Sequence, residues 1–257
     1  MRIMTVNVRY EGGDEGEHAW SNRRETLLAL VAGLAPDCFG LQEAMTGQVE
    51  AFAEAFPDHA AFGLFDEPLG AARNTIFAHR RYRPVDQGGY WLSESPHVPA
   101  SKSWDAALVR IANWVVLEDP TTGRRFRLVN THFDHKGERA RAEQARLLGE
   151  DAGGWPVDLP QLLTGDLNCP SGSLPIERLK SAGWHDTWAA SHGGDEEPGA
   201  TFHGFAGPAG ELPRRIDWIF RRGPVRAVAS EVVRDRPGGV WPSDHYFLWA
   251  DVELTAQ

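Results

Sequence analysis

The N-terminal part of the chain alternates between short apolar runs and one segment with helical spacing. Residues 3–8 and 38–41 are mostly apolar, whereas residues 21–34 place apolar side chains three and four positions apart, as in Leu27, Val31 and Leu34. Short apolar runs are typical of buried strands, and the wider spacing marks one face of a helix. The pattern predicts a strand, a helix and a second strand, with Ser21 as the helix N-cap.

The rest of the chain is richer in strand-like runs. A further helix is expected over residues 48–56 and another over 137–149. Runs rich in β-branched or aromatic residues, bounded by Gly, Pro, Asp and Asn, predict strands at 75–78, 108–117, 126–131, 161–164, 216–220 and 246–252. Stretches containing Gly and Pro predict loops at 67–72, 93–101, 193–199 and 204–213. This mixture of hairpins and crossovers predicts a layered α/β protein.

Composition narrows the possible partners. The chain has 257 residues, with Lys+Arg 26 against Asp+Glu 36 and a formal net charge of −10. That charge disfavours non-specific binding to duplex DNA or to an anionic membrane. No linker or internal repeat divides the sequence, so we expect a single domain over residues 1–257. We expect no obligate protein partner.

The termini and cysteines add two expectations. The N-terminus has no signal-peptide pattern, and no apolar run is long enough to span a bilayer, so a cytoplasmic location is expected. Cys38 and Cys169 are too few for a disulfide framework, and both are expected to be reduced thiols.

Polar side chains that suit catalysis stand at the ends of six predicted strands. Carboxylates, amides and imidazoles occur there at Asn7, Glu43, Asn130, His132, Asp134, Asp166, Asn168, Asp217, Asp244 and His245. Asn and Asp also favour turns, so any one of them alone is weak evidence. If these ends converge, they form an oxygen-rich site without thiolates, which suits Mg²⁺ better than zinc.

The order of these motifs resembles a known family. The set comprises Asn7, Leu41-Gln42-Glu43, Asn130-Thr131-His132, Thr164-Gly165-Asp166-Leu167-Asn168, Arg215-Ile216-Asp217 and Ser243-Asp244-His245. In order and spacing it resembles the endonuclease/exonuclease/phosphatase superfamily. The resemblance implies a deoxyribonuclease I-like fold: a four-layer α/β sandwich of two mixed β-sheets packed face to face and flanked by helices.

The resemblance also implies roles for individual residues. Glu43 would be the principal Mg²⁺ ligand, with Asn7 beside it and Asp244 completing the metal site, and Mn²⁺ is a candidate substitute. Asp166 would orient or deprotonate the attacking water. Asn168, His132 and His245 would hold the scissile phosphate, and Asp217 would support His245 or the metal. In-line attack at phosphorus needs a cation, hydrogen-bond donors and a base, and all three are present by residue type.

The loops resemble a bacterial branch of the superfamily whose substrate is often undefined. The similar stretches lie at residues 91–96, 104–110 and 201–205, which make Trp104, Arg110 and His203 candidate substrate contacts. Arg110 can offer a guanidinium to a phosphate, but it can equally pair with a surface carboxylate. That branch often has a Gly-Glu pair shortly before the strand at 75–78. Here Arg73 or Asn74 is the candidate contact instead.

Other chemistries remain open at this point. Asp166 and His245 could belong to a Ser-His-Asp triad, although no G-x-S-x-G motif occurs. Cys169 follows Asn168 directly, but no basic motif activates it, and a packing role is favoured. His132 and His135 could both bind zinc only if the strand has ended between them. We therefore assign His132 to the phosphate and His135 to the rim of the site.

Three functional hypotheses follow. The first is a Mg²⁺-dependent phosphoesterase that cleaves a phosphodiester or phosphomonoester by direct attack of water, on a small or single-stranded substrate. The second is a DNA or RNA nuclease, which would need a basic groove beside the metal. Arginines at positions 73, 80, 81, 83, 110 and 139 could form one by gathering on one face. The third is a non-catalytic binding protein on the same fold.

Overall fold

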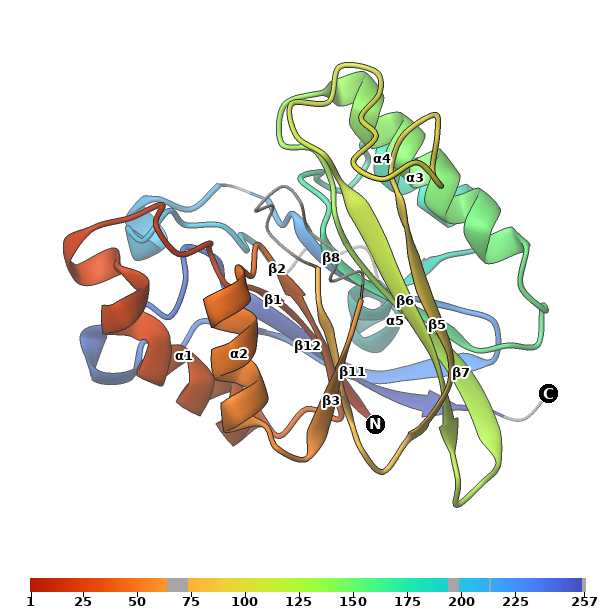
Figure 1. Cartoon of the computed structure of the whole chain (residues 1–257), viewed down its shortest axis with the longest axis horizontal. Coiled ribbons are helices and arrows are strands. Elements are labelled where there is room, and N and C mark those ends of the chain that lie inside the picture. The colour runs from red at the N-terminus through yellow and green to blue at the C-terminus, as the bar shows by residue number, and fades with distance from the viewer. Residues whose placement is uncertain (64–73, 194–198, 213, 256–257) are drawn as a thin grey trace.

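Two six-stranded β-sheets lie face to face at the centre of the computed structural model, with helices on both outer faces (Figure 1). The structure describes residues 1–63, 74–193, 199–212 and 214–255. Helices α1 (Trp20–Leu34) and α2 (Thr46–Ala55) cover one sheet, and α3 (Glu138–Gly153) and α4 (Leu174–Ser181) cover the other. The predicted four-layer α/β sandwich is confirmed.

Each sheet has one parallel pair near its centre. The strands of the first sheet, in spatial order, are β11 (Val225–Val233), β12 (Phe247–Leu254), β1 (Arg2–Asn7), β2 (Cys38–Gln42), β4 (Ile76–His79) and β3 (His59–Phe62). Those of the second are β5 (Arg83–Trp91), β6 (Ile111–Asp119), β7 (Arg124–His132), β8 (Gln161–Asp166), β10 (Asp217–Arg222) and β9 (His185–Asp186). The remaining helical elements are α5 (Thr187–His192) and the 3-10 turns Gly16–His18, Gly207–Ala209 and Pro237–Gly239.

The strand period of two separates the core into three layers. Successive side chains of a strand point to opposite faces. Ile3 of β1 and Leu128 of β7 therefore belong to the apolar layer between the sheets. Their neighbours Met4 and Val129 face outward and pack against α1 and α2 or α3 and α4, respectively. Both faces of the central strands are buried, which explains why their sequences are nearly continuous apolar runs.

The parallel pairs place the functional residues. β1 and β2 run parallel and are connected through α1, while β7 and β8 run parallel and are connected through α3. The carboxyl ends of β1 and β2 carry Asn7 and Glu43, and those of β7 and β8 carry His132 and Asp166. The two sheets bring these four ends together at one mouth of the sandwich.

A buried polar network joins the sheets just below this mouth. The Gln42 amide donates to Asn130 Oδ1 at 2.6 Å, and Thr164 Oγ1 is 3.0 Å from the same oxygen. Asn130 Nδ2 donates across to the Leu41 carbonyl at 2.7 Å. A Cβ at Gly40 would lie 2.3 Å from Asn130 Oδ1, so only glycine leaves room for the contact. Asn130 is therefore a bridge between sheets and not part of the cavity wall.

The sequence located most central elements and misplaced several boundaries. The helix predicted at 21–34 begins at Trp20 after Ala19, so the expectation that Ser21 is its N-cap is wrong. The strand predicted from 108 begins at Ile111, because the preceding residues form a loop held by Asp134. The helix predicted to end at 149 continues to Gly153. A Cβ at Gly149 would lie 2.8 Å from the Cβ of Ala182, so glycine at this position lets the end of α4 pack closely against α3.

Two long strands were missed entirely. The first half of β5 is exposed, and exposed residues recur along β11. A strand at the edge of a sheet with little apolar burial gives no alternating hydrophobic pattern to detect. In the described part of the chain, no helix combines the length and apolarity needed to cross a bilayer.

Candidate active site

A cavity of about 440 Å³ opens where the strand ends meet, and it is lined by most of the side chains that the sequence singled out. Asp166, His132, Asn168, His245, Glu43 and Asp244 all lie in its wall. Asn7 and Asp217 contact these residues from behind. The structure therefore brings together the predicted catalytic and metal-binding residues from both sheets.

Asp166 is the centre of the arrangement. One of its oxygens, Oδ2, lies 3.1 Å from Asn7 Nδ2, 3.3 Å from His132 Nε2 and 3.8 Å from His245 Nε2. The other oxygen accepts the backbone N–H of Asn168 at 2.9 Å. The Asp166 side chain is 2% exposed. A single buried carboxylate oxygen thus faces three nitrogen groups from three different strands or loops.

Burial changes the acidity of this carboxyl group. Removal from water raises the pKa of Asp166 to about 7, and the neighbouring carboxylates Asp217 and Glu43 also raise it. His245 and the N–H of Asn168 act in the opposite direction. A carboxyl group with this pKa can exchange a proton near neutral pH, which is what a general base requires.

His245 forms an ion pair with Asp217 behind the cavity. Its Nδ1 lies 2.9 Å from Asp217 Oδ2, and both side chains are buried. Burial lowers the pKa of His245, but the charges of Asp217, Asp166 and Asp244 and the hydrogen bond to Asp217 outweigh it and raise the pKa to about 10. The imidazole is therefore a cation at neutral pH, with Nε2 directed toward Asp166.

Backbone contacts hold this pair in place. Thr201 Oγ1 accepts the N–H groups of Ile216 and Asp217 at 2.9 and 3.1 Å. The carbonyl of Thr201 accepts from Tyr246 N at 2.7 Å. The loop around residue 201 therefore fixes both partners of the ion pair through one threonine.

His132 and Asn168 form a second hydrogen-bonded pair in the cavity wall. Asn168 Nδ2 lies 3.0 Å from His132 Nε2 and donates to the Phe133 carbonyl at 3.0 Å. Burial and the nearby cations Arg110 and His245 hold the pKa of His132 well below its usual range, so its ring is neutral. Asn168 adopts a left-handed backbone conformation (φ 49°), which turns the chain at the end of β8.

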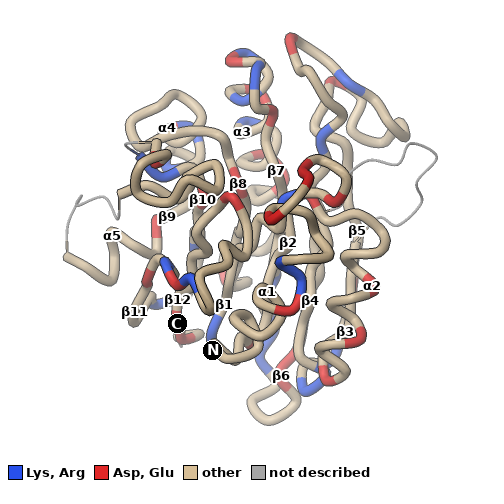
Figure 2. Tube along the Cα trace, turned by 90° about the vertical axis from the view of Figure 1, so that its left-hand side faces the viewer, with Lys and Arg blue, Asp and Glu red and all other residues tan. Residues whose placement is uncertain are grey.

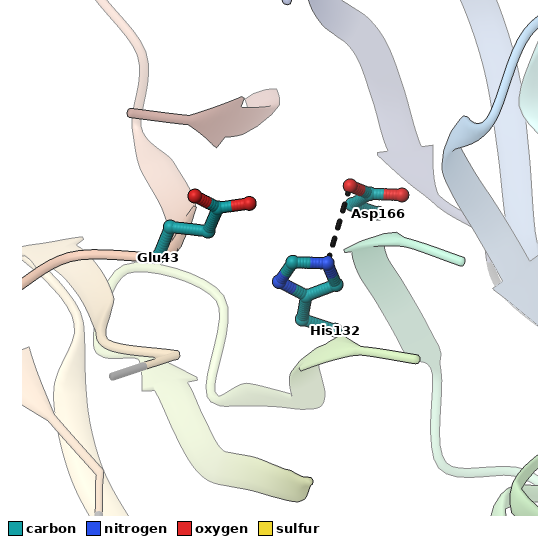
Figure 3. A group of neighbouring side chains, drawn as sticks. All are labelled: Glu43, His132 and Asp166. Carbon is teal, nitrogen blue, oxygen red and sulfur yellow. Dashed lines mark ion pairs between the residues drawn. The ribbon is translucent and has the colours of Figure 1, made fainter. Parts of the chain in front are cut away.

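Glu43, His132 and Asp166 form a group that can bind a cation (Figure 3). Each offers one ligand atom, and these atoms lie within 4.8 Å of one another. Asn7 Nδ2 is 3.3 Å from Glu43 Oε1 and links the glutamate to Asp166. The two carboxylates are the hard oxygen donors that a divalent cation prefers, whereas Asn7 turns its amide N–H toward them and its Oδ1 accepts the Arg9 N–H at 3.0 Å. The donor chemistry therefore fits a divalent metal.

Asp244 stands apart from that group. Its Oδ2 is 3.8 Å from Arg9 Nε, and its Oδ1 is 3.3 Å from the Ser243 hydroxyl. The second cluster with metal-ligand spacing contains Asp166, Asp217 and His245. The metal-binding role predicted for Asp244 stays a prediction.

Arg23 organises the site and was missed by the sequence reasoning. Its guanidinium, fully buried under α1, donates to the carbonyls of Val8, Arg9 and Pro242. It thereby ties the chain leaving β1 to the segment that leads into Ser243-Asp244-His245. The sequence did carry a signal for this role, because Arg23 stands on the otherwise apolar face of the predicted helix. A cation buried there needs several hydrogen-bond acceptors.

The predicted substrate contacts are divided. Arg110 lines the cavity, and His135 lies at the rim as expected. Asn74 is buried and donates to the Ile111 carbonyl at 2.9 Å, so its predicted contact with substrate is corrected to a structural role. Trp104, which adopts a left-handed backbone (φ 58°), is half-buried and lies outside the cavity wall. Arg73 lies outside the described residues.

His203 also needs correction. Its ring is fully buried, stacks on Tyr246 with centroids 4.3 Å apart, and packs at 4.6 Å from Trp241. Burial lowers the pKa of His203 to about 4. A neutral, enclosed ring cannot touch a ligand in the cavity, so His203 supports the loop behind the site.

Two alternative chemistries find no support in the geometry. The Ser243 hydroxyl donates to the Asn7 carbonyl at 2.7 Å, so its proton is used in positioning the backbone and not in a catalytic triad. Cys169 is buried, and burial raises the pKa of its thiol to about 12. It is a packing residue.

Comparison with known proteins decides the family. The family model described as Endonuclease/Exonuclease/phosphatase family matches residues 4–245. The chain belongs to this family. The family is named for endonucleases, exonucleases and phosphatases, so membership favours an enzyme over a non-catalytic binding protein.

Two solved structures of family proteins are similar over nearly the whole chain. One is the endonuclease/exonuclease/phosphatase from Bacteroides vulgatus, 28% identical with a TM-score of 0.89, with 98% of each chain covered. The other is a mannosyl-6-phosphatase from Bacteroides thetaiotaomicron, 29% identical with a TM-score of 0.86, covering 98% of this chain and 99% of that one.

A curated relative matches a shorter region. An uncharacterized protein of Acanthamoeba polyphaga mimivirus is 26% identical over 147 residues, which is 52% of this chain and 54% of the relative. The match thus spans about half the length of that protein.

Proposed function

We propose that this protein is a Mg²⁺-dependent phosphoesterase that hydrolyses a small phosphate ester by direct attack of water. The observation that carries the proposal is the convergence of Asn7, His132 and His245 nitrogens on one oxygen of Asp166. This arrangement supports the proposal because a base and groups able to bind a phosphoryl group need to lie together within one cavity.

In this proposal Asp166 accepts a proton from the attacking water. The protonated His245 donates from Nε2 to a phosphoryl oxygen and stabilises the negative charge that develops there. Asp217 keeps His245 charged and holds its ring in position through Nδ1. His132 and the Asn168 amide orient the phosphate without adding a full charge.

Glu43 and Asn7 are the residues that would hold Mg²⁺, with Mn²⁺ as a substitute and Asp244 as a further ligand. When bound, the cation supplies positive charge that polarises the phosphoryl group and stabilises negative charge on its oxygens. Burial raises the pKa of Asp166, and the neighbouring carboxylates Asp217 and Glu43 raise it further. A bound cation would offset the repulsion among these three carboxylates, which supports a cation site.

The rim of the cavity supports a small organic substrate. Tyr10, Leu108 and Leu212 all line the cavity and are 40%, 53% and 44% exposed, although side chains of this kind are usually buried. Aromatic and aliphatic side chains at a cavity mouth can pack on the apolar face of a sugar. A sugar phosphate is therefore our first candidate substrate class, and the mannosyl-6-phosphatase similarity supports it.

The distribution of charge argues against a long nucleic acid as substrate. Lys and Arg are interspersed with Asp and Glu along the chain and form no single stripe in the view of Figure 2. Arg81 pairs with Asp37 at the start of β2, and Arg83 pairs with Glu118 near the end of β6, both far from the mouth that holds Glu43. These arginines are therefore unavailable for a groove beside the site.

A cytoplasmic location and the lack of a membrane or protein partner stay predictions.

A substrate panel with and without Mg²⁺ tests the proposal. It comprises p-nitrophenyl phosphate, bis-p-nitrophenyl phosphate, mannose 6-phosphate and other sugar phosphates, nucleotides, and single- and double-stranded oligonucleotides. We expect Mg²⁺-dependent turnover of the small esters and loss of at least about 1,000-fold in Asp166→Asn, because the base is removed without a change in shape. Turnover restricted to oligonucleotides would favour the nuclease hypothesis. If no substrate of the panel were hydrolysed, the proposal would be contradicted.

A measurement of thermal stability tests Mg²⁺ binding independently of catalysis. Mg²⁺ is expected to raise the Tm of the wild-type protein, because a ligand that binds only the folded state stabilises it. Glu43→Gln should abolish this shift. Asp37→Asn, at the opposite end of β2, is the matched control and should keep the shift. An equal Tm response in all three proteins would remove Glu43 from the metal site.

A further inference from the structure

Arg110 is a largely buried cation in the wall of the catalytic cavity. It directly precedes β6, and its side chain is 10% exposed. It lines the same cavity as Asp166, Glu43 and His132. The sequence made Arg110 a candidate substrate contact, and the proposed mechanism gives it no step, although arginine is rarely buried to this extent without partners.

The carboxylate nearest to Arg110 is already fully used by other donors. Asp134 Oδ2 lies 3.9 Å from Arg110 Nε, beyond hydrogen-bond distance. Both oxygens of Asp134 instead accept backbone N–H groups, from Ala107 and Leu108 on one side and from Lys136 and Gly137 on the other, at 2.8–3.0 Å. Asp134 therefore organises two loops and does not accept a hydrogen bond from Arg110.

The hydrogen-bonding capacity of Arg110 is mostly unfilled. Within residues 1–63, 74–193, 199–212 and 214–255, its hydrogen-bond contact is from Nη2 to His135 Nδ1, at 3.3 Å. Its Nε is buried and has no acceptor there. A guanidinium carries five N–H donors in a planar fork that matches the oxygens of a phosphate. The largely buried guanidinium of Arg110, with unused N–H donors at a cavity wall, is therefore suited to binding an anion in that cavity.

The surroundings keep the group charged and close to the catalytic centre. Burial lowers the pKa of Arg110, and the carboxylates Asp134, Asp166 and Glu43 oppose this effect. Arg110 in turn helps to lower the pKa of His132 and His135. Arg110 also lines the cavity together with His132, Asn168 and His245, the residues proposed to bind the phosphoryl group.

We propose that Arg110 binds a charged phosphoryl oxygen that a monoester has and a diester lacks, and that it gives the enzyme a preference for phosphomonoesters. The inference rests on the proposed phosphoesterase function. A phosphomonoester carries close to two negative charges above its second pKa of about 6, whereas a diester carries one. In a diester the corresponding oxygen is esterified, so it is uncharged and its substituent faces the guanidinium.

The test compares two esters in three proteins. The value of kcat/KM is measured with Mg²⁺ for p-nitrophenyl phosphate and bis-p-nitrophenyl phosphate, in wild type, Arg110→Met and Arg81→Met. Loss of a charge-assisted contact should lower monoester turnover by about 10- to 100-fold in Arg110→Met. Diester turnover should change by less than about 3-fold. Arg81, which is exposed and paired with Asp37 far from the cavity, is the control.

Ligand binding supplies a readout that does not depend on turnover. Inorganic phosphate and dimethyl phosphate are titrated into each protein by calorimetry at pH 8, with Tm recorded to confirm folding. Arg110→Met should weaken phosphate binding at least about 10-fold and leave dimethyl phosphate unchanged, and Arg110→Lys should restore only part of the loss because it lacks the fork.

The outcomes separate the two proposals. An equal loss for both esters or both ligands in Arg110→Met would overturn the monoester preference, as would an unchanged affinity for phosphate. Failure of the wild-type protein to hydrolyse any ester would overturn the phosphoesterase function, whatever the variant does.

Discussion

At the scale of single residues, the site depends on unusual backbone conformations. Glu43 and Asn168 have φ values of 64° and 49°, in the left-handed region that non-glycine residues seldom adopt. Glu43 directly follows β2 and Asn168 lies two residues after β8, and both side chains line the cavity. Such conformations cost of order 1 kcal/mol or more and tend to occur at functional sites, where the surrounding structure maintains them.

The His245–Asp217 pair predicts a bell-shaped pH profile. Activity should rise as Asp166 loses its proton and fall as His245 loses its own, which its raised pKa of about 10 delays. In Asp217→Asn, the pKa of His245 should fall toward or below its ordinary value. We expect at least about a 10-fold loss of kcat at pH 8, with a smaller loss at pH 6. A parallel loss at all pH values would contradict this role for Asp217.

The same pair affects stability in a defined pH range. Because the folded-state pKa of His245 lies above its unfolded value of about 6.5, the pair stabilises the fold fully below pH 6.5. That contribution is lost as the pH rises through about 10. Urea unfolding of the wild-type protein and Asp217→Asn should therefore differ most at pH 6 and converge at high pH.

At the scale of elements, loops anchored by buried polar groups assemble the site. Asp134 holds residues 107 and 108, and Thr201 holds residues 216 and 217. Arg23 of α1 performs the same task for the chain after β1 and for the segment before His245. In each case one side chain satisfies several backbone groups that no strand or helix pairs.

The Arg23 clamp can be tested by substitution. Arg23→Met keeps an apolar stem but leaves the carbonyls of Val8, Arg9 and Pro242 without their donor. Unsatisfied buried groups cost about 1–3 kcal/mol each, so the free energy of unfolding should fall by at least about 2 kcal/mol. kcat should also fall by at least about 10-fold, because the reacting groups move. Arg24→Met, on the exposed side of the same helix, should leave both quantities unchanged.

At the scale of the whole molecule, catalysis requires the two sheets to stay in register with each other. Asn7 and Glu43 come from one sheet, and His132 and Asp166 from the other. The buried network of Gln42, Asn130 and Thr164 fixes the distance between the sheets just below the cavity. The separation of the catalytic groups is thus a property of sheet packing.

Gly40 tests this dependence. A methyl group there would lie 2.3 Å from Asn130 Oδ1 and 2.4 Å from Thr164 Oγ1, so Gly40→Ala should lower the free energy of unfolding by about 1–3 kcal/mol and reduce turnover. Gly33→Ala is the control. It lies in α1 with nothing within 4 Å of the added carbon and should stabilise the protein by about 0.5–1 kcal/mol. Equal stability of the two variants, measured by urea unfolding, would refute the sheet-spacing argument.

The sequence by itself determined the central strands and the chemical character of the site. Strands buried on both faces carry strong apolar runs, and the polar residues that end them stand out against those runs, as Asp166 and Asn168 do after residues 161–164. The order of six such motifs predicted the family and the fold, and both are confirmed. The single-domain expectation stays a prediction.

Only the tertiary structure decided which polar residues face the cavity and which support it. Asn74, His203 and Asn130 resemble site residues by type, but each is buried by segments distant in sequence. β5 and β11 lack an apolar pattern because they lie at sheet edges. The open fork of Arg110 follows from the saturation of Asp134 by four N–H groups from two loops. The burial of a side chain and the competition for its hydrogen bonds depend on contacts between segments that are distant in sequence. The pattern of residues within one segment does not indicate those contacts.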